Sequence, residues 1–134
     1  MNQERLAEAV GLAERVGHVF IATADRSGKA HLGAARRLSL GAGGRVVVSE
    51  WLCPETLNNL KQNRFISLVA WDVLADHGFQ LLGKLQEMND LEMLNGYSPD
   101  LAKNSPIPQV YRELFIQVDQ ILDFKIAPHS DLEE

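Results

Sequence analysis

Residues 45 to 72 read "RVVVSEWLCPETLNNLKQNRFISLVAWD" and define the central part of the fold. The β-branched run at the start predicts a strand that ends near Ser49-Glu50-Trp51. Pro54 then stands where a helix can begin, because the first helical position needs no backbone N–H donor. The closing run, residues 64 to 72, predicts another strand, and its nearly continuous apolar centre indicates burial on both faces.

Before this stretch, residues 3 to 16 predict an amphipathic helix. Asn2 is suited to cap its start and Gly17 to end it. The apolar positions recur at helical spacing and share one face: Leu6, Ala9, Val10, Ala13 and Val16.

The remaining elements are mainly strands. "HVFIATA" (18–24) and "AHLGAARRLSL" (30–40) predict two strands, and "GAGG" (41–44) predicts a hairpin turn. "GFQLLGKLQEM" (78–88) predicts a fifth strand, and residues 111 to 127 predict one or two more. Residues 88 to 97 look helical, whereas 98 to 109 carry three prolines and indicate a loop. Hairpin-linked strands with few helices predict a single antiparallel, barrel-like α+β domain over residues 1–134.

Composition excludes several classes of function. Against 18 acidic residues stand 13 Lys and Arg, which gives a formal charge of −5. Such a chain is a poor candidate for nucleic acid or for an anionic membrane surface, and we expect neither as a partner. No window is apolar enough for a membrane helix. Cys53 is the only cysteine, which predicts a reducing compartment and a cytoplasmic protein.

Three segments together resemble the pyridoxamine 5′-phosphate oxidase-like family of FMN-binding split barrels. They are residues 19–34, 45–72 and 78–88. The first resembles the family's opening hairpin, with Ala30 where proline is usual. The second resembles the helix pattern Asn-Leu-x-x-Asn-Pro-x-Val-Ser-Leu, with Arg64 in the proline position. The matching residues are His31, Asn59, Leu60, Asn63, Ser67, Leu68 and the run Leu81-Leu82-Gly83-Lys84. The resemblance implies a six-stranded antiparallel split β-barrel with short flanking helices, usually a homodimer, with FMN in grooves at the subunit interface.

The family's phosphate site is altered in this sequence. The basic pair that the family places at the start of the helix falls on Glu55 and Thr56. Thr56 keeps a hydroxyl donor, but Glu55 supplies no cation. Arg36 and Arg37 are the cations that remain nearby, and neighbouring strand residues point to opposite faces. Which of the two faces the groove is open, and a solvated arginine pair and an ordinary helix start explain these residues equally well.

The resemblance adds further cofactor-binding candidates. Ser49 and Glu50 lie where the family contacts the ribityl chain or the ring edge, and Asn59 belongs to the helix motif. Gln80 lies near a position that often donates an amide to the flavin. Trp51 could pack beside a flavin ring, although a tryptophan of the core or of a dimer interface is the simpler interpretation. Exposure at a strand end or on an alternating strand explains Ser49, Glu50 and Gln80 without a ligand.

The leading hypothesis is therefore a small FMN-binding flavoprotein, an oxidoreductase in which the cofactor carries the chemistry. No catalytic acid or base and no substrate are identified. The alternative is a non-enzymatic module of the same fold that binds flavin, deazaflavin or haem, or that serves for dimerisation. A weaker idea is a thiol or metal site that joins Cys53 to His129 and Asp131, although their spacing matches no zinc pattern.

Overall fold

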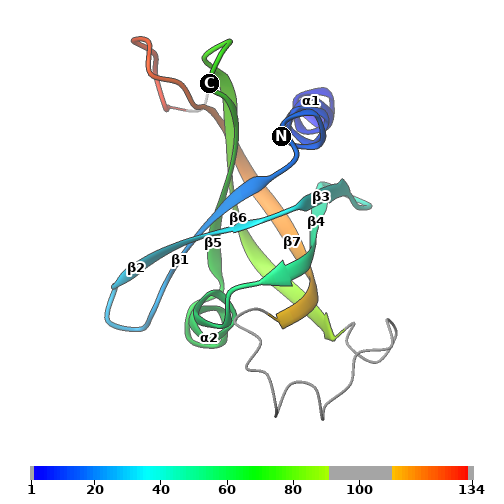
Figure 1. The fold of residues 1–134 in the computed structure, drawn as a ribbon, viewed down its shortest axis with the longest axis vertical. Coiled ribbons are helices and arrows are strands. Elements are labelled where there is room, and N and C mark those ends of the chain that lie inside the picture. The colour runs from blue at the N-terminus through cyan, green and yellow to red at the C-terminus, as the bar shows by residue number, and fades with distance from the viewer. Residues whose placement is uncertain (1, 91–109, 133–134) are drawn as a thin grey trace.

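The structure is a computed structural model that describes residues 2–90 and 110–132. Its elements run in the order α1 (Gln3–Val16), β1 (Val19–Ala24), β2 (Ala30–Ala35), β3 (Arg37–Leu40), β4 (Arg45–Leu52), α2 (Pro54–Gln62), β5 (Phe65–Asp72), β6 (His77–Asp90) and β7 (Val110–Asp123) (Figure 1). Neither helix is long and apolar enough to cross a membrane, a statement that covers the described residues only.

The strands form one curled antiparallel sheet in the order β2-β1-β5-β6-β7-β4-β3. The predicted fold class, mainly β with two helices and a barrel-like antiparallel sheet, is confirmed. The strand count is seven rather than six, because the predicted second strand bends at Arg36 and divides into β2 and β3. β2 pairs with β1, β3 pairs with β4, and β2 also contacts β4. The bend therefore brings the two edges of the sheet together.

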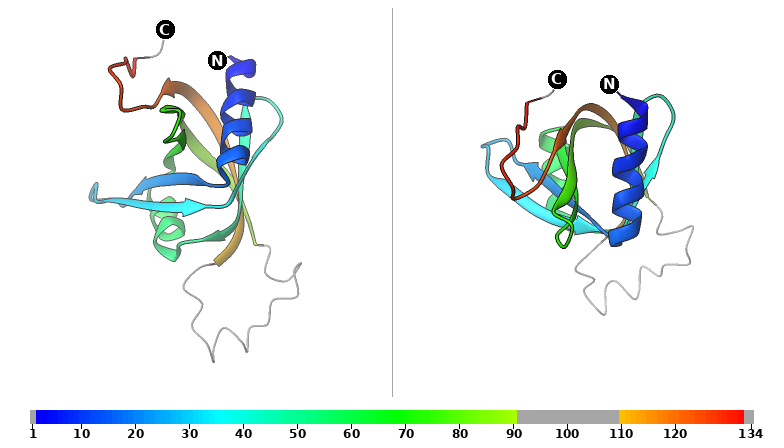
Figure 2. Two further views of the ribbon diagram at one scale, coloured as in Figure 1. Left: turned by 45° about the horizontal axis from the view of Figure 1, so that its top comes forward. Right: turned by 90° about the horizontal axis from the view of Figure 1, so that it is seen from above.

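Helix α1 forms where the sequence predicts it. The Asn2 side-chain oxygen accepts hydrogen bonds from the backbone N–H groups of Glu4 (2.9 Å) and Arg5 (3.2 Å). Gly17 ends the helix with a φ of 86°, a conformation that glycine adopts without strain. The helix lies across the curled sheet and contacts β3 and β5 (Figure 2). Its apolar face joins a core built from every strand and both helices.

Gly83 of β6 occupies a position at which the fold requires a glycine. The ladder between β6 and β7 shifts its register at Leu82 and Gly83. A Cβ atom on Gly83 would lie 2.2 Å from the backbone oxygen of Gln117. The two strands therefore approach more closely here than any side chain allows.

Helix α2 confirms the helix predicted from Pro54, and it packs on β1 and β2. The helix predicted from residue 88 is wrong at its start, because β6 continues as a strand to Asp90. The rest of that prediction, and the loop predicted for 98–109, fall within 91–109 and lie outside the described residues.

The C-terminal tail is attached to the β5–β6 turn through Asp76. The Asp76 carboxylate accepts hydrogen bonds from the backbone N–H groups of Ile126 (2.8 Å) and Ala127 (2.9 Å) and from the indole Nε1 of Trp71 (3.2 Å). These donors, first the two backbone groups, hold the pKa of Asp76 below its usual value because they stabilise the ionised form.

Candidate functional site

Two arginines and one glutamate meet at the bend between β2 and β3. The Nε atom of Arg36 lies 3.8 Å from Oε2 of Glu50, and that of Arg37 lies 3.5 Å from Oε1. The arginine side chains are 79% and 64% exposed, whereas that of Glu50 is 21% exposed. We call these three residues the Arg-Glu cluster. It carries one positive charge in excess, on two guanidinium groups that remain open to solvent.

The backbone explains why both arginines reach the same carboxylate. Arg36 occupies the bend and Arg37 begins β3 opposite Ser49 of β4, so the two do not follow the alternation of a continuous strand. Glu50 has a φ of 92°, in the left-handed region that non-glycine residues rarely adopt. The expectation that only one arginine could face the groove assumed an unbroken strand.

A pocket of about 280 Å³ lies beside the Arg-Glu cluster. Trp51 forms one wall, and its ring meets that of Tyr111 edge to face at a centroid distance of 5.0 Å. The remaining lining comes from the end of α1 and from β2: Gly17, His18, Ala34 and Ala35, together with Arg36 and Glu50. A second hollow of about 600 Å³ shares Gly17 and Arg36 and also includes Arg37, Glu14 and Ser39. The structure thus brings four predicted site residues together: Arg36, Arg37, Glu50 and Trp51.

Two other predicted residues, Thr56 and Asn59, lie on the buried face of α2. The Thr56 hydroxyl lies 3.5 Å from Nδ1 of His31. The Asn59 side-chain amide donates to the Thr23 hydroxyl at 3.1 Å, and its oxygen Oδ1 is buried with no hydrogen-bond partner. Within this chain both side chains face the β1–β2 hairpin rather than the pocket.

The start of α2 carries Glu55 and Cys53. Glu55 is exposed and has no ion-pair partner within the described part of the chain. Cys53 precedes the helix, and a Cβ on Gly33 of β2 would lie 3.4 Å from its sulfur. The tail that holds His129 and Asp131 lies at the opposite end of the molecule from α2 (Figure 1). Among the described residues, no group of three or more His, Cys, Asp or Glu side chains could hold a metal ion.

Gln80 belongs to a different surface, the convex side of β2, β1, β5 and β6. Its amide Nε2 donates to the Ser67 hydroxyl at 2.8 Å. Residues that are paired in the β1–β2, β1–β5 and β5–β6 ladders point to the same side of the sheet, and most of those on the convex side are apolar. We call this surface the outer apolar face: Phe20, Ala22, Ala24, Ala30, Leu32, Ala34, Phe65, Ser67, Val69, Gln80, Leu82 and Lys84, the last being the one charged member. Leu32 is 66% exposed and Phe65 is 63% exposed, so the face lies uncovered in the single chain.

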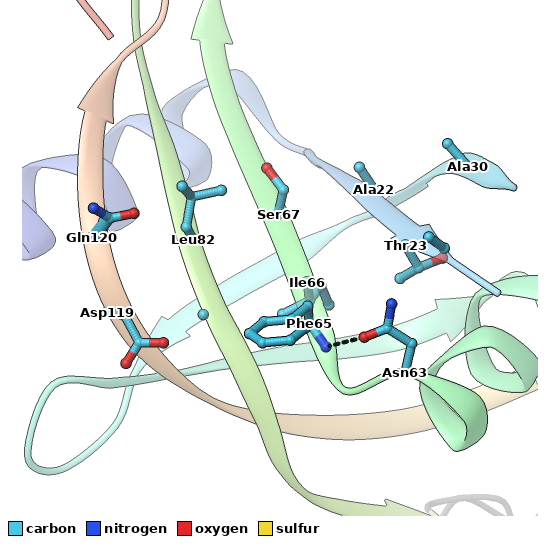
Figure 3. Close-up of a pocket in the computed structure, with 12 residues that line it drawn as sticks. Ala22, Thr23, Ala30, Asn63, Phe65, Ile66, Ser67, Leu82, Asp119 and Gln120 are labelled. Carbon is cyan, nitrogen blue, oxygen red and sulfur yellow. Dashed lines mark hydrogen bonds between the residues drawn. The ribbon is translucent and has the colours of Figure 1, made fainter. Parts of the chain in front are cut away.

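The outer apolar face is hollowed at one end into a pocket of about 440 Å³ (Figure 3). Its wall combines Ala22 and Ala30 of the first hairpin with Ser67 of β5 and Leu82 of β6, and Gln120 of β7 lies next to Leu82, its partner in the β6–β7 ladder. Asn63 lies at one end of the pocket, where its side-chain oxygen accepts a hydrogen bond from the backbone N–H of Phe65 at 3.1 Å. The apolar centre of residues 64–72 is the sequence feature that predicts this surface, because it indicates that both faces of β5 are buried. No sequence feature predicts that His18 lines the pocket beside the Arg-Glu cluster or that Tyr111 packs against Trp51.

Likeness to solved structures defines the class of fold: the chain has the pyridoxamine 5′-phosphate oxidase-like split-barrel fold. No protein-family model matches the sequence, and a search of curated proteins finds no match. The solved structures it resembles include an FMN-binding protein from Syntrophomonas wolfei subsp. wolfei, with a TM-score of 0.68, 17% identity and coverage of 96% of this chain and 91% of that one. They also include a protein of Clostridium acetobutylicum related to general stress protein 26, of the pyridoxinephosphate oxidase family, with a TM-score of 0.66, 19% identity and coverage of 99% and 96%.

A third similar structure is HutZ, the haem storage protein from Vibrio cholerae. It has a TM-score of 0.56 and 12% identity, and the match covers 93% of this chain and 96% of HutZ. At identities this low the likeness establishes the fold. The similar proteins bind different groups, so the ligand must be argued from the residues of this chain.

Proposed function

We propose that this chain is a small FMN-binding flavoprotein, an oxidoreductase that works as a homodimer. The observation that carries the proposal is the Arg-Glu cluster beside the Trp51 pocket. Two guanidinium groups share one carboxylate there, which leaves one positive charge in excess at an exposed site. A phosphate ester is the natural ligand of such a pair, since guanidinium groups bind phosphate through two parallel hydrogen bonds.

The residues around the pocket supply some, though not all, of the contacts that FMN needs. Arg36 and Arg37 would hold the phosphate, and Trp51 would pack beside the ring system. Thr56, which the family likeness places at the phosphate, has its hydroxyl buried against His31 in this chain. The arginines therefore supply the phosphate contacts in this proposal, and Glu55 weakens them by its charge.

A second copy of the chain would complete the site. The pocket beside the cluster, at about 280 Å³, is at the lower limit of ligand pockets, which span roughly 300–1,000 Å³. The outer apolar face supports dimerisation, because apolar side chains such as Leu32 and Phe65 are otherwise left in water. The bound flavin would supply the electron or hydride chemistry, while the chain binds and orients it. A cytoplasmic location is proposed from the single cysteine.

The second candidate is the non-enzymatic module of the same fold, which holds deazaflavin, haem or flavin without turnover. Glu55 favours it, because an exposed carboxylate stands at the helix start where a phosphate would need a cation. If the module holds haem, haem titration should produce a Soret band that survives gel filtration, whereas added FMN should be lost.

Titration of purified protein with FMN and with riboflavin tests the proposal, because riboflavin lacks only the phosphate. Wild-type protein should retain FMN through gel filtration and bind it at least about tenfold more tightly than riboflavin, as hydrogen bonds to a charged group require. Arg36→Ala combined with Arg37→Ala should bring FMN down to the riboflavin affinity. Arg26→Ala, an exposed arginine in the β1–β2 turn, is the matched control and should change neither.

A charge change at Glu55 probes the same site. Glu55→Lys should tighten FMN binding and leave riboflavin unaffected. If neither wild-type protein nor this variant binds flavin after reconstitution, the proposed function is wrong.

A further inference from the structure

Glu50 occupies the position at which an external anion would meet Arg36 and Arg37. Its two carboxylate oxygens are divided between the arginines, one to each Nε. Within the described residues neither guanidinium has another hydrogen-bonding or charged partner. At 3.5 and 3.8 Å these ion pairs are loose, and pairs of this kind contribute little in water. The carboxylate is therefore a weak internal ligand that a stronger anion can displace.

The backbone at Glu50 gives independent reason to single out this residue. Its φ of 92° lies where a side chain is strained, yet the position is held by β4, with Arg112 of β7 opposite it in the ladder. Strain of this kind persists only where the surrounding structure imposes it, and it gathers at functional sites. Glu50 is also the least exposed member of the cluster. The chain thus holds a carboxylate between two exposed cations.

We propose that Glu50 is the internal counter-ion of Arg36 and Arg37 and that it makes the site selective for dianionic phosphate esters over carboxylates. The inference rests on the proposed function and names the residue that sets its ligand class. An incoming carboxylate would only replace one singly charged group by another. A phosphate dianion brings two charges and three acceptor oxygens, so it gains on displacing Glu50.

Other charged groups near the cluster do not replace Glu50 in this role. Glu14 and His18 line the neighbouring hollows, and Glu113 faces Ser49 across the β4–β7 ladder. None of these three forms an ion pair with Arg36 or Arg37. Glu50 alone, among the described residues, is paired with both arginines.

The test is a titration with inorganic phosphate and with acetate at constant ionic strength, followed by the shift in melting temperature and by tryptophan fluorescence, to which Trp51 contributes. Glu50→Gln should bind phosphate roughly five- to tenfold more tightly than wild type, since two weak ion pairs no longer compete. It should also begin to bind acetate. Glu8→Gln, which removes an exposed carboxylate of α1 that forms no ion pair among the described residues, is the control and should stay within about twofold of wild type.

Glu50→Gly provides a second variant that removes the carboxylate and also relieves the positive φ. It should show the same gain in phosphate affinity. Equal phosphate affinity for wild type, Glu50→Gln and Glu50→Gly would overturn the inference, and so would an equal gain in the control Glu8→Gln.

The two proposals fail in different ways. If FMN does not bind but Glu50→Gln still tightens inorganic phosphate, only the flavin assignment fails. If wild type and Glu50→Gln bind FMN with equal affinity, and also bind inorganic phosphate with equal affinity, the flavin assignment stands and the role of Glu50 is refuted.

Discussion

The positive φ at Glu50 predicts a reversal in the usual order of glycine and alanine. In an ordinary strand, glycine is less stable than alanine by about 0.5–1 kcal/mol, because it loses more backbone freedom on folding. At a φ of 92° a residue with a Cβ atom is strained by about 1–2 kcal/mol. Glu50→Gly and Glu50→Ala both lack the carboxylate, so the difference between them isolates the backbone. Glycine should be the more stable of the two by about 0.5–1 kcal/mol.

Ser49, one residue earlier in β4, provides the control. It is paired in the ladder with Arg37, and its φ is not positive. There the ordinary order should hold, with Ser49→Ala more stable than Ser49→Gly by about 0.5–1 kcal/mol. The two neighbouring positions should therefore give differences of opposite sign.

Urea unfolding of the four variants, without added ligand, measures the free energy of unfolding directly. The variants should share one slope with denaturant, so that a change in midpoint reports stability. If alanine exceeds glycine at position 50 as it does at position 49, the backbone at Glu50 is not strained, and the strain argument for its role must be abandoned.

Two further predictions concern stability. Gly83→Ala should destabilise the fold by about 3 kcal/mol or more in urea unfolding, because the new methyl group would meet the backbone of Gln117. Gly11→Ala in α1 is the control, since nothing lies within 4 Å of the added atom, and it should stabilise the fold by about 0.5–1 kcal/mol. Equal effects of the two substitutions on the free energy of unfolding would contradict the close approach of the strands at Gly83. Asp76, whose pKa is lowered in the folded state by the amides of Ile126 and Ala127, contributes stability above its ordinary pKa that is lost as pH falls through the lowered value. Asp76→Asn should remove that part of the acid dependence below about pH 4, and an unchanged pH profile of unfolding would show that the tail contact contributes nothing.

The sequence was most informative where a local rule decides the structure. Asn2 bounds α1 through its capping side chain and Gly17 through its positive φ, as their residue types predict, and Pro54 starts α2. The division of the second strand had no such signal. "AHLGAARRLSL" alternates well enough to pass for one strand, and only the pairing of its halves with β1 and β4 requires the bend at Arg36. That tertiary constraint also decides which way the arginines point.

The predicted site residues fall into two separate places in the structure, again because tertiary packing and not local sequence decides which way side chains point. Spacing along α2 places Thr56 and Asn59 on one helical face, but it does not say whether that face meets solvent or sheet. The structure turns it toward Thr23 and His31, which are opposite each other in the β1–β2 ladder. The predicted residues near the chain bend, Arg36, Arg37, Glu50 and Trp51, therefore lie together, whereas Thr56 and Asn59 on the helix are part of the packing.

The balance of charge at the site depends on geometry more than on composition. From the sequence, Glu55 stands out, because the family that the sequence resembles has a cation at the matching position. In the structure Glu55 is exposed and unpaired within the described residues, whereas Glu50 is mostly buried and divided between both arginines. Charge interactions weaken with distance and with exposure to water. The nearer and less exposed carboxylate should therefore govern anion binding, and removing Glu50 should change phosphate affinity more than removing Glu55.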